Sequence, residues 1–279
     1  MRISGFTLIR NAILYDFPIV ESISSLLPFV DEYVVNVGRS DDETLALVQS
    51  IASPKIKIIE TVWDESLKAD GKLFGLQQDV ALAACTGDWA ICLQGDEVVH
   101  EDDLPIIRQA LETYLDQPEV MGLVFRMVHF KGDFWSVDPW MYHHATRIVR
   151  GGGKVRSAID GFDFEVIANS EVIKHGPSGR RIPARIFHYG YARKAAALRE
   201  KRRYQIRRHE GERLSEESID RWAEEDAQFL DYGILKNFRG THPRAMQALV
   251  NNAVKLKPYR NRWFNPAFYR RVLAQGFRG

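Results

Sequence analysis

Residues 87–97 read Gly-Asp-Trp-Ala-Ile-Cys-Leu-Gln-Gly-Asp-Glu, and this stretch decides the fold that we expect. Before it, residues 76–85 carry Ala, Leu and Val at helical spacing, and Gly87 stands where a helix C-terminal cap is expected. The apolar run 89–93 is too short for another helix and is typical of a strand buried on both faces of a sheet. It leads into Gln94, Gly95, Asp96 and Glu97. Since ligands of open α/β sheets bind at the carboxyl ends of strands, two adjacent carboxylates here predict a functional site.

A structural role for Asp96, at the start of the next helix, is the alternative. Asp102, Asp103 and Pro105 account for that helix start better, because Asp caps free amides and Pro suits the first turn. Carboxylate oxygens suit hard cations such as Mg²⁺ or Mn²⁺, which proteins commonly hold through one or two carboxylates plus substrate phosphates. Asp96 therefore predicts a metal site.

Residues 83–97 resemble the a-x-G-D-W-x-x-x-L-D-A-D-E segment of glycosyltransferase family 2 enzymes. The resemblance implies a GT-A fold, in which a metal at an Asp-x-Asp motif holds the diphosphate of a nucleotide sugar. Asp96 matches the second Asp of that motif and is an expected metal ligand. Gln94 stands in place of the first Asp, so it can hydrogen-bond a ribose but brings no charge to the metal.

Residues 186–193, Ile-Phe-His-Tyr-Gly-Tyr-Ala-Arg, are similar to the family's I-x-H-Y-G-Y-x-R segment. A lone His after a short strand would otherwise be interpreted as a packed or capping residue. In the family this His can complete the metal site, so the resemblance makes His188 the second expected metal ligand. A neutral imidazole suits Mn²⁺ somewhat better than Mg²⁺.

The remaining pattern alternates strands and helices. Strands are expected at 6–9, 33–37, 55–60 and 121–130, and helices at 18–27 and 103–115. The short connections predict right-handed β-α-β units. We therefore expect an α/β, GT-A (Rossmann-like) mixed and mainly parallel sheet flanked by helices over residues 1–195. A basic, mostly helical C-terminal region is expected over 196–279.

The resemblance also implies nucleotide-binding residues at the strand ends and in the loop before residue 76. Asn36 stands where the family often has Asp, and its amide can still bond a base edge or a ribose hydroxyl. Arg10 could face the diphosphate or be a solvated loop arginine, and Asp41 is expected to cap the helix that starts at Thr44. The expected nucleotide-binding set is Thr7, Arg10, Asn11, Asn36, Lys72 and Gln94.

An inverting sugar transfer needs a carboxylate that accepts the proton of the attacking acceptor hydroxyl. In relatives with a His-Glu pair in this part of the chain, the acid falls near Asp160. The His is absent here, and Asp163 is an equally spaced alternative, so both are candidate general bases. The aromatic run 134–140 suits either sugar stacking or a packed core.

The net charge of +1 hides an asymmetry between the two ends of the chain. Residues 176–279 contain 23 Lys and Arg against 10 Asp and Glu, whereas residues 1–175 contain 15 against 27. The basic region, with its crowded helix over 194–208, fits an anionic acceptor or an anionic membrane surface, or complements the acidic part within the fold.

Several classes of protein are excluded or disfavoured. No apolar run approaches the roughly 20 residues of a membrane-spanning helix, and the N-terminus lacks a secretory-signal layout, so a cytoplasmic location is expected. Cys85 and Cys92 form neither a metal spacing nor a disulfide framework. No nucleic-acid-binding module is recognisable.

The resemblance to glycosyltransferase family 2 implies a metal-dependent, inverting, hexosyltransferase-type glycosyltransferase. Its expected donor is a UDP-, GDP- or dTDP-linked sugar, its cofactor Mn²⁺ or Mg²⁺, and its acceptor a glycan or glycolipid such as a lipopolysaccharide core or surface polysaccharide. A homodimer and peripheral membrane contact stay open. One alternative is a non-catalytic carbohydrate-binding or scaffolding descendant, because Gln94 removes a carboxylate. The other is a nucleotidyltransferase, although Arg10-Asn11-Ala12 does not resemble its Gly-rich loop.

Overall fold

The computed structural model describes residues 1–67, 72–210, 214–228, 235–255, 269 and 273. Its main sheet has ten strands in the order β13-β7-β6-β8-β4-β1-β2-β3, with β12 paired to both β6 and β5. The strands are β1 (Ile3–Ile9), β2 (Glu32–Gly38), β3 (Ile56–Thr61), β4 (Trp89–Cys92), β5 (Glu97–Val99), β6 (Gly122–Lys131), β7 (Ser136–Val137), β8 (His144–Arg150), β12 (Gly179–Tyr191) and β13 (Lys236–Asn237). A small antiparallel sheet contains β9 (Val155–Ser157), β10 (Phe164–Val166) and β11 (Glu171–Val172).

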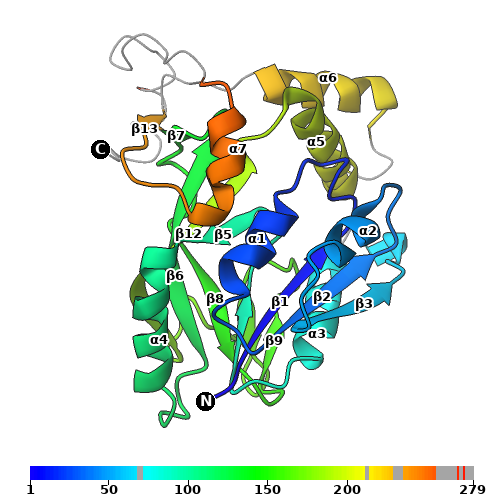
Figure 1. Cartoon of the computed structure of the whole chain (residues 1–279). Helices are drawn as coiled ribbons and strands as arrows, with labels where there is room; N and C mark the ends of the chain where they lie inside the picture. The colour runs from blue at the N-terminus through cyan, green and yellow to red at the C-terminus, as the bar shows by residue number, and fades with distance from the viewer. Residues whose placement is uncertain (68–71, 211–213, 229–234, 256–268, 270–272, 274–279) are drawn as a thin grey trace.

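The N-terminal half of the main sheet is parallel. β1 pairs in parallel with β2 and β4, and β2 pairs in parallel with β3. β8 is antiparallel to both β4 and β6, while β12 runs parallel to β6. The sheet is thus mixed and flanked by helices, which confirms the predicted α/β fold class (Figure 1).

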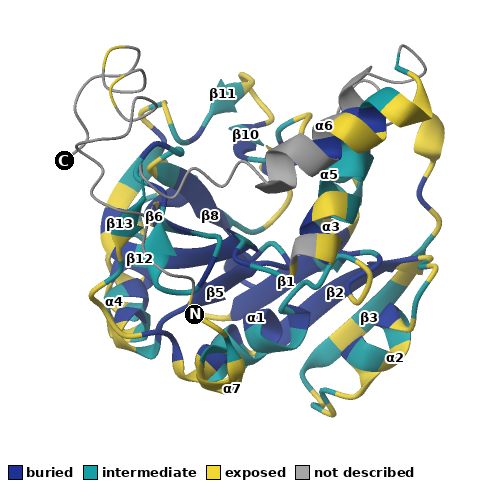
Figure 2. Ribbon diagram, turned by 90° about the horizontal axis from the view of Figure 1, so that it is seen from above, coloured by how far each residue is buried: buried dark blue, intermediate teal, exposed yellow. Residues whose placement is uncertain are grey.

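Helices cover both faces of the sheet. On one face, apolar residues of α1 (Ile19–Leu26), α2 (Thr44–Gln49) and α4 (Leu104–Thr113) pack on residues such as Ile3, Val35 and Ile91. On the other face, α3 (Lys72–Ala83) and the small sheet pack on Phe6 and Val34. The central strands are accordingly the buried, dark blue layer of Figure 2. Burial on both faces explains why the strand after Gly87 is an unbroken apolar run rather than an alternating one.

Gly87 has a different role from the expected helix cap. Helix α3 ends at Ala83, several residues before Gly87. A Cβ atom on Gly87 would lie 2.7 Å from the backbone nitrogen of Ser4. The glycine is therefore needed for close approach to the first strand.

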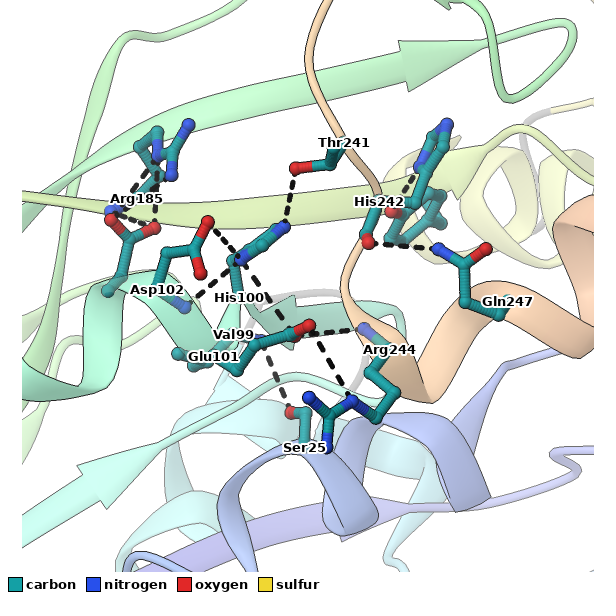
Figure 3. A network of polar contacts seen from close by, with 12 residues as sticks. Ser25, Val99, His100, Glu101, Asp102, Arg185, Thr241, His242, Arg244 and Gln247 are labelled. Atoms are coloured by element: carbon teal, nitrogen blue, oxygen red, sulfur yellow. Dashed lines mark hydrogen bonds and ion pairs between the residues drawn. The ribbon is translucent and has the colours of Figure 1, made fainter.

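The C-terminal part contains α5 (Ala195–Glu210), α6 (Glu216–Gln228) and α7 (Gln247–Asn252). α5 packs along α6, and β13 extends the main sheet through β7. Figure 3 shows how residues 241–247 are joined to the turn after β5: Thr241 Oγ1 lies 3.0 Å from His100 Nε2, and the backbone N–H of Arg244 donates to Glu101 at 2.9 Å. The part of the chain from residue 236 to 252 is thus bound to the main sheet by side-chain as well as backbone contacts.

None of the described helices is both long enough and apolar enough to cross a membrane.

Candidate active site

A cavity of about 440 Å³ lies where β1 and β4 end, and helix α5 contributes to its wall. Segments that are distant in sequence meet there: the turn after β1, the loop after β4, the loop at residues 160–162, the end of β12 and α5. Figure 1 shows α5 and α6 over this end of the sheet. The position is the carboxyl edge at which the sequence predicts a site.

Asp96, in the 94–97 loop, and His188, on β12, come together in this cavity. Asp96 Oδ1 lies 3.7 Å from His188 Nε2, and the two side chains are 5% and 7% exposed. The backbone N–H of Tyr189 donates to the carbonyl of Asp96 at 2.8 Å, which fixes the loop against the strand. The two residues that the sequence predicts as metal ligands are therefore neighbours.

The tautomer of His188 follows from its partner His129. His129 Nε2 is 2.7 Å from the carbonyl of Tyr142, which can only accept, so this nitrogen carries the proton. Burial lowers the pKa of His129 to about 4, so its Nδ1 is an unprotonated acceptor at neutral pH. His188 Nδ1, 2.9 Å away, must then donate to it. Since burial also holds the pKa of His188 well below its ordinary value, Nε2 presents a lone pair toward Asp96.

Gly190 keeps the space between these two groups free of side-chain atoms. A Cβ atom at this position would lie 2.4 Å from His188 Nε2 and 2.9 Å from Asp96 Oδ2. A carboxylate oxygen and an imidazole lone pair that face each other across such a space fit two ligands of Mn²⁺ or Mg²⁺. Among the residues with described positions, no three His, Cys, Asp or Glu side chains group as a metal site.

The other oxygen of Asp96 is bound by two cations. Arg193 Nη2 donates to Asp96 Oδ2 at 2.8 Å, and Lys201 Nζ donates to the same oxygen at 2.9 Å. Burial acts to raise the pKa of Asp96, but these charges outweigh it and hold the pKa well below its usual value. Asp96 is therefore ionised at neutral pH.

The two candidate bases differ in position. Asp160 is exposed and lines the cavity, where one of its oxygens accepts from the N–H of Phe162 at 3.0 Å. Asp163 is only 4% exposed, lies outside the cavity wall and forms an ion pair with Lys174 at 3.1 Å.

Some of the expected nucleotide-binding residues line the cavity, and others lie outside its wall. Arg10, Asn11 and Gln94 line the cavity. Thr7 is fully buried in β1, and Lys72 is exposed at the start of α3; both lie outside the cavity wall.

Asn36 is buried outside the cavity wall, in a network of its own. It donates to the carbonyl oxygen and the side-chain oxygen of Gln77 at 2.8 and 3.0 Å and accepts from Thr61 at 2.7 Å. These bonds use its amide within the fold.

Asn11 holds the ends of β1 and β2 together. Its amide donates to Asp41 at 3.0 Å and its side-chain oxygen accepts from the N–H of Asp41 at 2.8 Å. The backbone φ of Asn11 is 53°, a left-handed value that Asn tolerates better than most residues. The expected helix-capping role of Asp41 is wrong: Asp42 accepts from the N–H of Thr44 at 3.0 Å, while Asp41 lines the cavity.

Several wall residues carry no local sequence signal. Aromatic side chains from separate places in the chain line the cavity, among them Tyr15, Trp63, Phe74, Tyr142, Phe162 and Tyr204. In the run 134–140, by contrast, Phe134 packs on Tyr189 with ring centroids 5.6 Å apart, so the core interpretation holds for this ring.

No protein-family model matches the chain, and no curated protein matches it. Solved structures with some likeness include TarS of S. aureus, at 15% identity and a TM-score of 0.42 over 79% of this chain and 42% of TarS. TarS 1–349 has 15% identity and a TM-score of 0.40 over 82% of this chain and 72% of its own. Glucosyl-3-phosphoglycerate synthase from Mycobacterium tuberculosis, in complex with Mg²⁺ and uridine diphosphate, has 16% identity and a TM-score of 0.30 over 45% and 43%. This chain thus spans less than half the length of the first and third of these proteins.

Proposed function

We propose that this protein is a family 2-like, GT-A glycosyltransferase that moves a sugar from a nucleotide sugar to a hydroxyl of a glycan or glycolipid, with inversion at the anomeric carbon. The observation that carries the proposal is one cavity that combines the Asp96–His188 pair with the exposed carboxylate of Asp160. These groups match the two chemical requirements of the reaction, a site for the diphosphate and a base for the acceptor.

In this proposal Asp160 takes the proton from the acceptor hydroxyl as that oxygen bonds to the anomeric carbon. The bond from the anomeric carbon to the diphosphate oxygen breaks at the same time, and the nucleoside diphosphate leaves. Asp163 stays the second candidate base, but its burial and its ion pair with Lys174 favour a structural role. Aromatic rings such as Tyr142 and Phe162 offer faces on which the apolar side of a sugar can stack.

Asp96 Oδ1 and His188 Nε2 would hold a divalent cation, Mn²⁺ or Mg²⁺. When bound, such an ion neutralises the charge that develops on the departing diphosphate. The chain's own contribution is to present an ionised carboxylate and a neutral imidazole in the correct tautomer, in a space that Gly190 keeps open.

The positive charge on the surface of α5 is relevant to the kind of acceptor that the protein binds. Arg203 forms an ion pair with Asp220 at 2.8 Å, and Arg207 pairs with Glu216, so carboxylates of α6 neutralise part of the basic helix. This pairing leaves less uncompensated positive charge on α5 for contact with an anionic membrane surface.

The test is calorimetric titration of UDP, GDP, CMP and dTDP into the wild-type protein and Asp96→Ala, with Mn²⁺ and with a chelator. We expect one nucleotide to bind the wild type in Mn²⁺ and to lose most of its affinity in the variant. Binding of no nucleotide under any condition would refute the transferase. Sugar binding by that same protein would then support the carbohydrate-binding alternative, which the loss of a carboxylate at Gln94 favours.

A further inference from the structure

Lys201 lines the cavity although it belongs to the C-terminal region. Its ammonium group donates to Asp96 Oδ2 at 2.9 Å and to the carbonyl of Gly190 at 3.3 Å, and its side chain is 14% exposed. It lines the cavity alongside Tyr204 and Gln205 of the same helix. The helix thus places a positive charge beside the proposed metal ligand.

The two oxygens of Asp96 have separate partners. Oδ2 accepts from Lys201 and Arg193, whereas Oδ1 faces His188 Nε2 at 3.7 Å. A cation between Oδ1 and His188 would therefore leave the contacts of Lys201 on Oδ2 in place. Lys201 need not be displaced for the proposed site to be filled.

The charges in this contact set do not balance. Lys201 and Arg193 carry two positive charges, and Asp96 is the carboxylate to which both donate. These three side chains together therefore have one positive charge in excess. An excess charge in a buried site is costly unless an anion approaches it.

The ammonium is fixed in position and still has capacity for a ligand. It lies 5.3 Å from the ring centroids of both Phe17 and Tyr191, at the distance of cation–π contacts. The bonds to Asp96 and Gly190 use two of its three N–H groups, so within the described contacts one N–H is available. A lysine held this way is a point charge suited to phosphate oxygens.

We propose that Lys201 binds the diphosphate of the donor, so that helix α5 completes the donor site from outside residues 1–195. The inference rests on the proposed function and adds a residue and a region to it. It distinguishes Lys201 from Arg203 and Arg207 of the same helix, which pair with α6.

The experiment compares Lys201→Met, Lys201→Arg and Lys194→Met. Lys194 is the matched control, because its side chain is 84% exposed and it precedes the same helix. Each variant is titrated by calorimetry, in Mn²⁺ and in chelator, with a nucleoside diphosphate and its matching nucleoside. The pairs are UDP and uridine, GDP and guanosine, and dTDP and thymidine. Thermal unfolding of each variant reports whether it folds.

For the nucleotide that binds the wild type, we expect Lys201→Met to lower the affinity for the diphosphate by about 10- to 100-fold. The affinity for the matching nucleoside should change by less than about twofold, Lys201→Arg should recover most of the loss, and Lys194→Met should match the wild type. Unchanged or tighter diphosphate binding by Lys201→Met would overturn the inference, as would an equal loss for the nucleoside. Failure of the wild type to bind any nucleotide would instead overturn the proposed function, and this inference with it.

Discussion

The buried pair of Arg147 and Glu97 is where we expect one substitution to affect stability and the cavity together. Arg147 Nε and Nη2 each donate to a Glu97 oxygen at 2.7 Å, and the two side chains are 1% and 0% exposed. Glu97 also accepts from the N–H of Gln94 at 3.1 Å, and Arg147 donates to the carbonyl of Phe162 at 3.0 Å. Gln94 and Phe162 both line the cavity, so the pair connects two of its loops.

Arg147→Met leaves the carboxylate of Glu97 buried without its cation. Breaking a buried ion pair in this way costs about 3–5 kcal/mol. At about 2–4 °C per kcal/mol for chains approaching this length, Tm should fall by about 6–20 °C. Arg147→Met combined with Glu97→Gln removes both charges, so the double variant should be more stable than the sum of the two single losses by at least about 1 kcal/mol.

Urea and thermal unfolding, followed by circular dichroism, measure these differences. Arg156→Met is the control: its 3.1 Å pair with Glu165 is at the surface, with 47% of the arginine side chain exposed, and should be worth at most about 1 kcal/mol. A loss of less than 1 kcal/mol for Arg147→Met, or strict additivity in the double variant, would refute the reasoning.

Three further predictions concern the site and pH. His129→Phe removes the acceptor for His188 Nδ1–H, so we expect the Mn²⁺ concentration that supports nucleotide binding to rise by about 10- to 100-fold. An unchanged Mn²⁺ titration would show that His129 does not fix the tautomer of His188. Asp160→Asn should lower kcat by about 10²–10⁴-fold with donor affinity retained, and Asp163→Asn should keep kcat; the reverse result assigns the base to Asp163. Burial acts to raise the pKa of Glu32, but its hydrogen bonds lower that pKa to about 2. The ionised form of Glu32 therefore stabilises the fold above about pH 5, and this stabilisation is lost as the pH falls toward about 2. Glu32→Gln should make the free energy of unfolding fall less steeply over this pH range, and an unchanged slope would contradict the expectation.

The sheet could be predicted because its signals are local, and two short motifs led us to expect Asp96 and His188 close together. An apolar run of five residues after Gly87 defines strand β4, and the loop that follows must then reach the carboxyl edge of the sheet. Asp96 and His188 stand in two spaced motifs, and the structure places them 3.7 Å apart. The sequence could not show whether Asp41 or Asp42 accepts from the first free amide of α2, because both stand just before the helix. In the structure Asp42 accepts from Thr44, and Asp41 points to Asn11 instead.

The aromatic wall and Lys201 could not be predicted, because they depend on where α5 packs. The helix has Arg and Lys on several sides, which is typical of a solvated basic surface. One signal was available: Leu198, Lys201 and Gln205 are three and four residues apart, so the lysine shares a helix face with a buried leucine. That spacing places Lys201 inward, but only the tertiary structure brings it to Asp96.

The segment His188-Tyr-Gly-Tyr-Ala-Arg193 shows why these residue types occur at this spacing. His188 presents a lone pair, and Gly190 alone leaves room for it, because any Cβ there would lie 2.4 Å from Nε2. Tyr189 points into the core, where its hydroxyl is 2.8 Å from His242 Nδ1 and its ring stacks on Phe130. Tyr191 flanks the ammonium of Lys201, and Arg193 holds Asp96. His188 and Tyr189 thus face the cavity and the core as neighbouring residues of a strand do. The irregular pairing of β12 with β6 between His188 and Tyr191 breaks this alternation, so that Tyr191 also lines the cavity. Two members of the motif, His188 and Arg193, therefore meet at the carboxylate of Asp96, one at each of its oxygens.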